Sequence, residues 1–117
     1  MNTAPLITVL ETSIYLSRAK GLLSEQERDA IVTMLAANPT CGDLIVGGGG
    51  IRKVRFAIEG KGKSGGARVI YFFHSADYPV LLLSVYAKSV RATITKAEAS
   101  GLAKLGKIFI ETYGVSR

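Results

Sequence analysis

The stretch from Ile51 to Phe73, IRKVRFAIEGKGKSGGARVIYFF, predicts two adjacent β-strands joined by a basic, glycine-rich turn. Side chains alternate in character along residues 51–59, which is typical of a strand with one buried face. The apolar residues that share the buried face are Val54, Phe56 and Ile58. Lys53 and Arg55 share the opposite face, about 7 Å apart at the rise of a strand. Because burying unpaired cations is costly, this second face should look towards solvent or a partner.

The turn and its flanks carry an excess of positive charge. Six basic residues and one acidic residue, Glu59, lie between positions 52 and 68. The basic ones are Arg52, Lys53, Arg55, Lys61, Lys63 and Arg68. A charged pair on an exposed strand is usually a solvated face, but this concentration, set among glycines that let backbone approach a phosphate, favours a polyanionic partner. The turn lacks the G-x-x-x-x-G-K-[ST] spacing of a P-loop.

Outward from this stretch, the pattern predicts a chain that mixes strands and helices. Two capping boxes, Ser24–Glu27 and Thr95–Glu98, open the two longer helices. The first of these should end near Asn38, because Pro39 disfavours a helical residue before it. The expected elements are strands at 6–10, 51–59, 67–74 and 80–87, and helices at 12–20, 24–38 and from 95 onward. This β-α-α-β-β-β-α order favours an α+β fold, with a small antiparallel sheet packed against helices on one face.

Length and composition narrow the class of protein. The 117 residues, 48% of them hydrophobic, fit a single domain over 1–117. The N-terminus does not resemble a secretory signal and no apolar run reaches the roughly 18 residues of a membrane span, so a cytoplasmic protein without membrane partners is expected. The single cysteine, Cys41, and the single histidine, His74, are too few for a metal centre, and no cofactor is expected.

Charge is unevenly distributed between the two halves of the chain. Residues 1–51 hold three basic and five acidic residues, whereas residues 52–117 hold twelve basic and four acidic residues. We therefore expect the second half to bind the polyanion and the first half to act as scaffold.

Three segments together resemble the RelE/HigB family of bacterial toxins, and the HigB-like branch in particular. They are Gly49–Arg55 (GGIRKVR), Gly60–Tyr71 (GKGKSGGARVIY) and Tyr86–Lys88 (YAK). The resemblance spans nearly the whole chain and implies a RelE-like fold, related to that of microbial ribonucleases. It also implies a ribosome-dependent endoribonuclease that cleaves messenger RNA in the ribosomal A site, and a helix-turn-helix antitoxin as the cognate partner.

The resemblance also implies roles for individual residues. Lys53 and Arg55 match the family's paired strand cations, Arg68 its phosphate-binding arginine, and Lys88 the cation that ends its last strand. These four are the predicted catalytic residues. The predicted RNA-binding residues are Arg52, Lys61, Lys63 and Arg91. Some relatives carry a tyrosine where residues 91–95 read RATIT here, and we expect Tyr71 and Tyr86 to be core or edge residues instead.

These residues suggest a metal-independent reaction in which the RNA 2′-hydroxyl attacks the adjacent phosphate. Arg68 would bind the phosphate, because a guanidinium holds two oxygens at once. Lys53 is the candidate general base, because neighbouring cations disfavour its charged form. Lys88 would hold the phosphate or protonate the leaving oxygen.

Two other functions remain open at this point. A ParE-like toxin would share the fold and poison DNA gyrase, but that branch lacks the RNA-cutting residues present here. A non-catalytic RNA-binding module would show salt-sensitive binding without cleavage.

Overall fold

The computed structural model describes residues 6–58 and 66–115. The elements, in chain order, are β1 (Val9–Glu11), α1 (Ser13–Ala19), α2 (Glu25–Ala37), β2 (Asp43–Leu44), β3 (Ile51–Phe56), β4 (Ala67–Phe72), β5 (Val80–Ala87) and α3 (Lys96–Val115). The α+β class is confirmed, and so is the predicted order except for one added strand, β2. A strand of two residues is too short to show a period in the sequence. No helix within the described ranges is long and apolar enough to cross a membrane.

The five strands form one sheet in the order β1-β5-β4-β3-β2. Strands β3, β4 and β5 pair antiparallel, as predicted, with a register shift between Ile70 and Tyr71 of β4, and the added strand β2 also pairs antiparallel with β3. The expectation of a purely antiparallel sheet was wrong at one edge, because β1 pairs parallel to β5. Parallel neighbours need a long crossover, and the two helices that follow β1 supply the chain for it.

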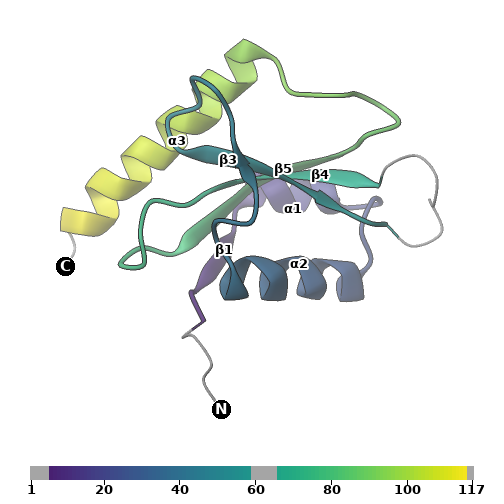
Figure 1. Ribbon diagram of the computed structural model, residues 1–117, viewed down its shortest axis with the longest axis horizontal. Coiled ribbons are helices and arrows are strands. Elements are labelled where there is room, and N and C mark those ends of the chain that lie inside the picture. The colour runs from purple at the N-terminus through teal and green to yellow at the C-terminus, as the bar shows by residue number, and fades with distance from the viewer. Residues whose placement is uncertain (1–5, 59–65, 116–117) are drawn as a thin grey trace.

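Helices cover both faces of the sheet, which corrects the predicted one-sided arrangement (Figure 1). On one face, α1 and α2 pack Tyr15, Ile31 and Leu35 against β4 and β5. On the other, α3 packs Ala99 against a cluster that includes Phe72 and Leu83, with Leu102, Phe109 and Ile110 alongside. Every residue of β4 is buried as a result. Burial on both faces explains why Val69 to Phe72 form a continuous apolar run rather than an alternating one.

The path of α3 determines where the basic face stays open. Ile51 is fully buried in the cluster beneath α3. Lys53 and Arg55 lie on the same face of β3 but further along it, where Lys53 is half-buried and Arg55 is exposed. We predicted that the cations would keep helices off their face of the strand. This is true at the end of β3 that carries Lys53 and Arg55, but not at the Ile51 end.

Both predicted capping boxes are present. The Ser24 Oγ accepts from the Glu27 amide at 3.1 Å, and the Glu27 carboxylate accepts from the Ser24 amide at 2.8 Å. Thr95 and Glu98 make the equivalent pair at 3.1 and 3.0 Å. Helix α2 ends at Ala37 with Asn38 as its cap, as the following proline predicts. The local signals at these helix ends agree with the tertiary structure.

A glycine allows α3 to approach the sheet closely. A Cβ on Gly106 would lie 2.7 to 3.0 Å from three ring atoms of Phe72, a side chain that is only 4% exposed. By contrast, a Cβ on Gly101 in the same helix would meet nothing within 4 Å. The two glycines weaken the helix equally in an isolated chain, but only one of them is needed for packing.

We expect opposite effects from alanine at these two glycines. Gly106→Ala should lower the free energy of unfolding by about 1–3 kcal/mol, because the buried Phe72 ring must shift. Gly101→Ala should raise it by about 0.5–1 kcal/mol, because alanine loses less backbone entropy in a helix. Urea unfolding followed by circular dichroism measures both, and stabilisation by both substitutions would contradict the packing described for Gly106.

Candidate active site

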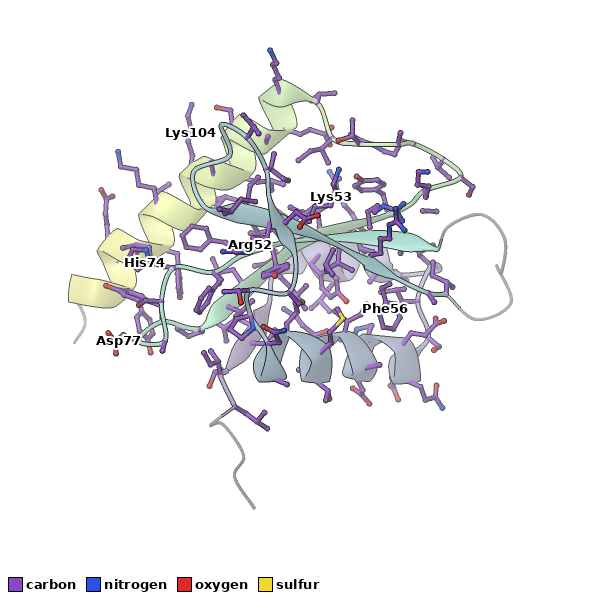
Figure 2. The ribbon with its side chains drawn as sticks, in the orientation of Figure 1. Arg52, Lys53, Phe56, His74, Asp77 and Lys104 are labelled. Atoms are coloured by element: carbon purple, nitrogen blue, oxygen red, sulfur yellow. The ribbon has the colours of Figure 1, made fainter. Side chains whose placement is uncertain are left out.

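The open end of the basic face forms a groove of about 590 Å³. Its lining residues are Cys41, Asp43, Lys53, Val54, Arg55, Arg68, Lys88 and Ala92. The four predicted catalytic residues therefore lie together, contributed by β3, by β4 and by the loop after β5. Figure 2 shows Lys53 on β3 at this side of the sheet, with Lys104 on α3.

Strand register brings two arginines face to face in the groove. Arg55 and Arg68 are direct partners across β3 and β4, and Tyr86 of β5 is the next partner of Arg68. Arg68 is only 7% exposed, and its Nη1 donates to the Ala67 carbonyl at 3.3 Å. Like charges placed directly opposite each other destabilise a sheet. This pairing therefore brings two positively charged side chains to the same groove.

The last cation of the groove is placed by the end of the sheet. The Lys88 amide donates to the Gly66 carbonyl at 3.0 Å, which continues the β4–β5 pairing beyond Ala67 and Ala87. Gly66 has a φ of +63°, and a Cβ there would lie 2.4 Å from the Phe56 carbonyl oxygen. The exposed Lys88 side chain thus starts from a tightly held backbone position.

The groove also contains a carboxylate that no sequence pattern had indicated. Asp43 of β2 is the direct partner of Lys53 and lies exposed at the groove's edge. No local pattern marks it, because it reaches the groove only by pairing in a two-residue strand. Cys41 lies nearby, with its Sγ 3.9 Å from the Tyr71 hydroxyl. No three histidine, cysteine or acidic residues gather as metal ligands within residues 6–58 and 66–115.

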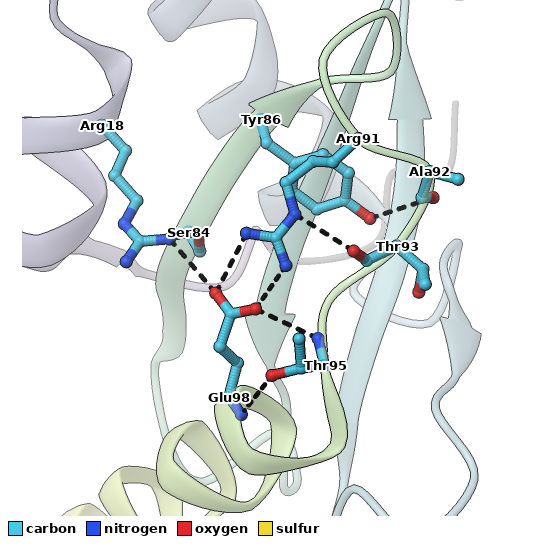
Figure 3. Close-up of polar contacts among 8 residues, drawn as sticks. All are labelled: Arg18, Ser84, Tyr86, Arg91, Ala92, Thr93, Thr95 and Glu98. Carbon is cyan, nitrogen blue, oxygen red and sulfur yellow. Dashed lines mark hydrogen bonds and ion pairs between the residues drawn. The ribbon is translucent and has the colours of Figure 1, made fainter.

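The predicted RNA-binding residues do not all reach the groove. Arg52 lies on the other face of β3, where its Nη1 donates to the Gly42 carbonyl at 2.7 Å and holds the loop before β2. Lys61 and Lys63 lie outside the described residues. Arg91 is in the loop between β5 and α3, and its guanidinium is engaged within the protein (Figure 3).

Arg91 is held by a carboxylate at the start of α3. Its Nη2 donates to Glu98 Oε1 and its Nη1 to Glu98 Oε2, the second contact at 3.2 Å. Hydrogen bonding from Arg91, and next from the Thr95 amide, lowers the pKa of Glu98 to about 2. Arg91 also lies over the Tyr86 ring, 5.2 Å from its centroid. This geometry gives Arg91 a structural role that the sequence did not indicate.

Both strand tyrosines are buried, as expected. The Tyr71 hydroxyl donates to the Pro39 carbonyl and accepts from the Gly42 amide, each at 2.8 Å. Burial raises the pKa of Tyr71, and burial also raises the pKa of Tyr86, where the nearby Arg91 and Arg68 oppose the shift. Neither phenol is therefore an acceptor of protons at neutral pH.

A comparison with known families identifies this architecture. The family model described as the RelE toxin of the RelE/RelB toxin–antitoxin system matches residues 17–114. The chain belongs to the RelE toxin family. The matched region runs from α1 into α3 and contains all four cations of the groove. The protein is thus a toxin of a toxin–antitoxin pair, from a family whose members generally inhibit translation as ribonucleases and are silenced by an antitoxin.

The Glu98–Arg91 pair predicts a loss of stability in acid. The folded-state pKa of Glu98, about 2, lies below its ordinary value of 4.5, so its contribution is fully present above that ordinary value. It should be lost as pH falls from about 4.5 towards 2, when protonation breaks the pair. Urea midpoints measured from pH 6 to pH 3 should fall less steeply in Glu98→Gln than in the parent protein. Equal slopes would show that the pair does not contribute.

Proposed function

We propose that this toxin is an endoribonuclease that cleaves messenger RNA in the ribosomal A site by metal-independent attack of the RNA 2′-hydroxyl. The observation that supports the proposal is the groove in which Lys53, Arg55, Arg68 and Lys88 converge. Cations placed in advance around a phosphate stabilise the charge that develops in the transition state. Such electrostatic stabilisation usually accounts for more of an enzyme's rate enhancement than any other effect.

Arg68 is the proposed ligand of the scissile phosphate. Its low exposure and its place in a strand buried on both faces restrict the guanidinium to few positions. A planar guanidinium can bind two phosphate oxygens and keeps its charge at any physiological pH. Arg55, directly opposite, is exposed and would contact the neighbouring phosphate or the same one from the other side.

Asp43 is the proposed acceptor of the 2′-hydroxyl proton. A carboxylate offers acceptor oxygens, whereas a lysine ammonium offers only donors. Lys53, the cross-strand neighbour of Asp43, then serves to stabilise the phosphate. This assignment replaces Lys53 as the base proposed from sequence and keeps Lys53 in the catalytic set.

These groups account for both proton transfers in the reaction. The 2′-oxygen forms a bond to phosphorus as its proton passes to Asp43, and the bond from phosphorus to the 5′-oxygen breaks. Lys88 donates a proton to that leaving oxygen, which yields a 2′,3′-cyclic phosphate and a 5′-hydroxyl end. Flexible RNA seldom holds its 2′-oxygen in line with the leaving oxygen, so substrate held by the ribosome would supply that orientation.

The proposed partner follows from the family and the groove together. An antitoxin is implied by the family, and the HigB-like resemblance extends this to one with a helix-turn-helix domain. The positive groove would attract an acidic segment of such a partner, which could cover it directly.

Cleavage in cells should depend on the groove cations. Expression without antitoxin is expected to arrest growth and to produce new 5′ ends within translated reading frames. Lys53→Ala and Arg68→Ala should abolish both effects, because each removes charge from the phosphate site. Lys104→Ala removes the same charge from the exposed surface of α3 and should retain both.

Each contrary result of that experiment has a distinct meaning. Arrest without new 5′ ends would favour a gyrase poison, which a supercoiling assay would then detect. Full cleavage by both groove variants would contradict the proposed site.

The assignment of Asp43 predicts a change in rate at saturating toxin. Asp43→Asn should slow cleavage of ribosome-bound message by about 100-fold or more, because the amide cannot accept the proton. Asp29→Asn removes an exposed carboxylate from α2 and serves as the control. A small effect of Asp43→Asn beside a large effect of Lys53→Gln would return the role of base to Lys53.

A further inference from the structure

One wall of the groove is a loop whose Arg91 side chain is held by a carboxylate of α3. Residues 88–95 connect β5 to α3, and Lys88 and Ala92 from this loop line the groove. The loop folds back on itself through amides of Val90 and Arg91, which donate to the Ala87 carbonyl at 3.0 and 3.2 Å. Short turns of this kind need further contacts to hold one position against a solvent-exposed face.

The Glu98 carboxylate contacts both the loop and α1 (Figure 3). It receives the two-pronged hydrogen bond from Arg91 in the loop. It also lies 3.7 Å from Nη1 of Arg18, which reaches over from α1 and donates to the Ser84 hydroxyl of β5 at 3.3 Å. A forked arginine–carboxylate pair fixes direction as well as distance, so Glu98 holds the Arg91 side chain in one orientation.

Arg91 in turn contacts Tyr86, a strand residue next to the groove. Its guanidinium covers the ring of Tyr86, whose hydroxyl is 3.5 Å from the Ala92 carbonyl. Tyr86 is the direct cross-strand partner of Arg68 and lies on the same face. Two side chains therefore lie between Glu98 and the proposed phosphate ligand: Arg91, which covers the Tyr86 ring, and Tyr86, which is paired with Arg68 across the strands.

We propose that Glu98 is a positioning residue for RNA cleavage. Acting through Arg91, it fixes Tyr86 beside Arg68 and sets the loop that carries Lys88, and so determines how the two cations are placed around the phosphate. This inference rests on the proposed ribonuclease activity. It also explains why Arg91 is paired inside the protein instead of facing the groove as a further RNA ligand.

The same carboxylate has a second role that can be separated experimentally. Glu98 Oε1 also accepts from the Thr95 amide, and Thr95 Oγ1 accepts from the Glu98 amide, which together cap α3. Glu98→Gln keeps an oxygen for the Thr95 amide but loses the charged fork to Arg91. Thr95→Ala loses half of the cap but leaves the fork intact. Both variants weaken the helix start, and only the first releases the loop.

The test compares Glu98→Gln, Arg91→Gln, the double variant and Thr95→Ala in two measurements. The first is the single-turnover rate of message cleavage on programmed ribosomes over a range of toxin concentrations. The second is amide hydrogen exchange of Lys88, Val90 and Arg91 in the isolated toxin. We expect Glu98→Gln and Arg91→Gln to lower the saturating rate about tenfold or more, with little change in the half-saturating concentration. The double variant should be no slower than either single variant, because both substitutions remove the same Glu98–Arg91 contact.

Thr95→Ala should keep the parental saturating rate and the parental exchange in the loop, even where its urea midpoint falls. Equal losses of rate in Thr95→Ala and Glu98→Gln would overturn the inference, because helix capping alone would then explain them. Faster exchange in Glu98→Gln with an unchanged rate would also overturn it. If the parent protein does not cleave, the proposed function fails, and unchanged loop exchange in Glu98→Gln would then separately overturn the positioning of the loop.

Discussion

The opposition of Arg55 and Arg68 across β3 and β4 is the constraint on which the site depends. Two guanidinium groups in direct register repel each other, and one of them is almost completely buried. The pairing of β4 between β3 and β5 is extensive enough to impose this cost. The register of the sheet thereby places two cations in the groove for which a phosphate is the proposed ligand.

The two faces of the sheet have different roles. On the α1 and α2 side, Val54 and Phe56 complete an apolar core that makes the sheet rigid. On the α3 side, the helix covers only the Ile51 end of β3 and leaves the Lys53 end to form the groove. Close approach at Gly106 keeps α3 down on Phe72 and away from the cations. The packed core thus holds the strands, and with them the side chains of the groove, in fixed relative positions.

Glu98 links helix stability to the geometry of the site. One carboxylate caps α3, pairs with Arg91 and lies within 4 Å of Arg18 of α1. Its depressed pKa, about 2, reflects the hydrogen bonds from Arg91 and Thr95. Because the loop that it holds also forms a wall of the groove, the start of the helix and the active face are parts of one network.

Sequence by itself determined the local features: the alternation that separates Lys53 and Arg55 from Val54, the capping boxes at Ser24 and Thr95, and the family through an ordered run of short motifs. These signals lie within a few residues of one another, so a single chain segment carries them. Tertiary structure alone decided three things: the parallel pairing of β1, the arrival of Asp43 beside Lys53, and the capture of Arg91 by Glu98. Each depends on how segments that are distant in the sequence pack together. Strand β2 is too short to show a periodic pattern, and the contacts of a charged side chain such as Arg91 depend on which residue lies beside it in the folded protein.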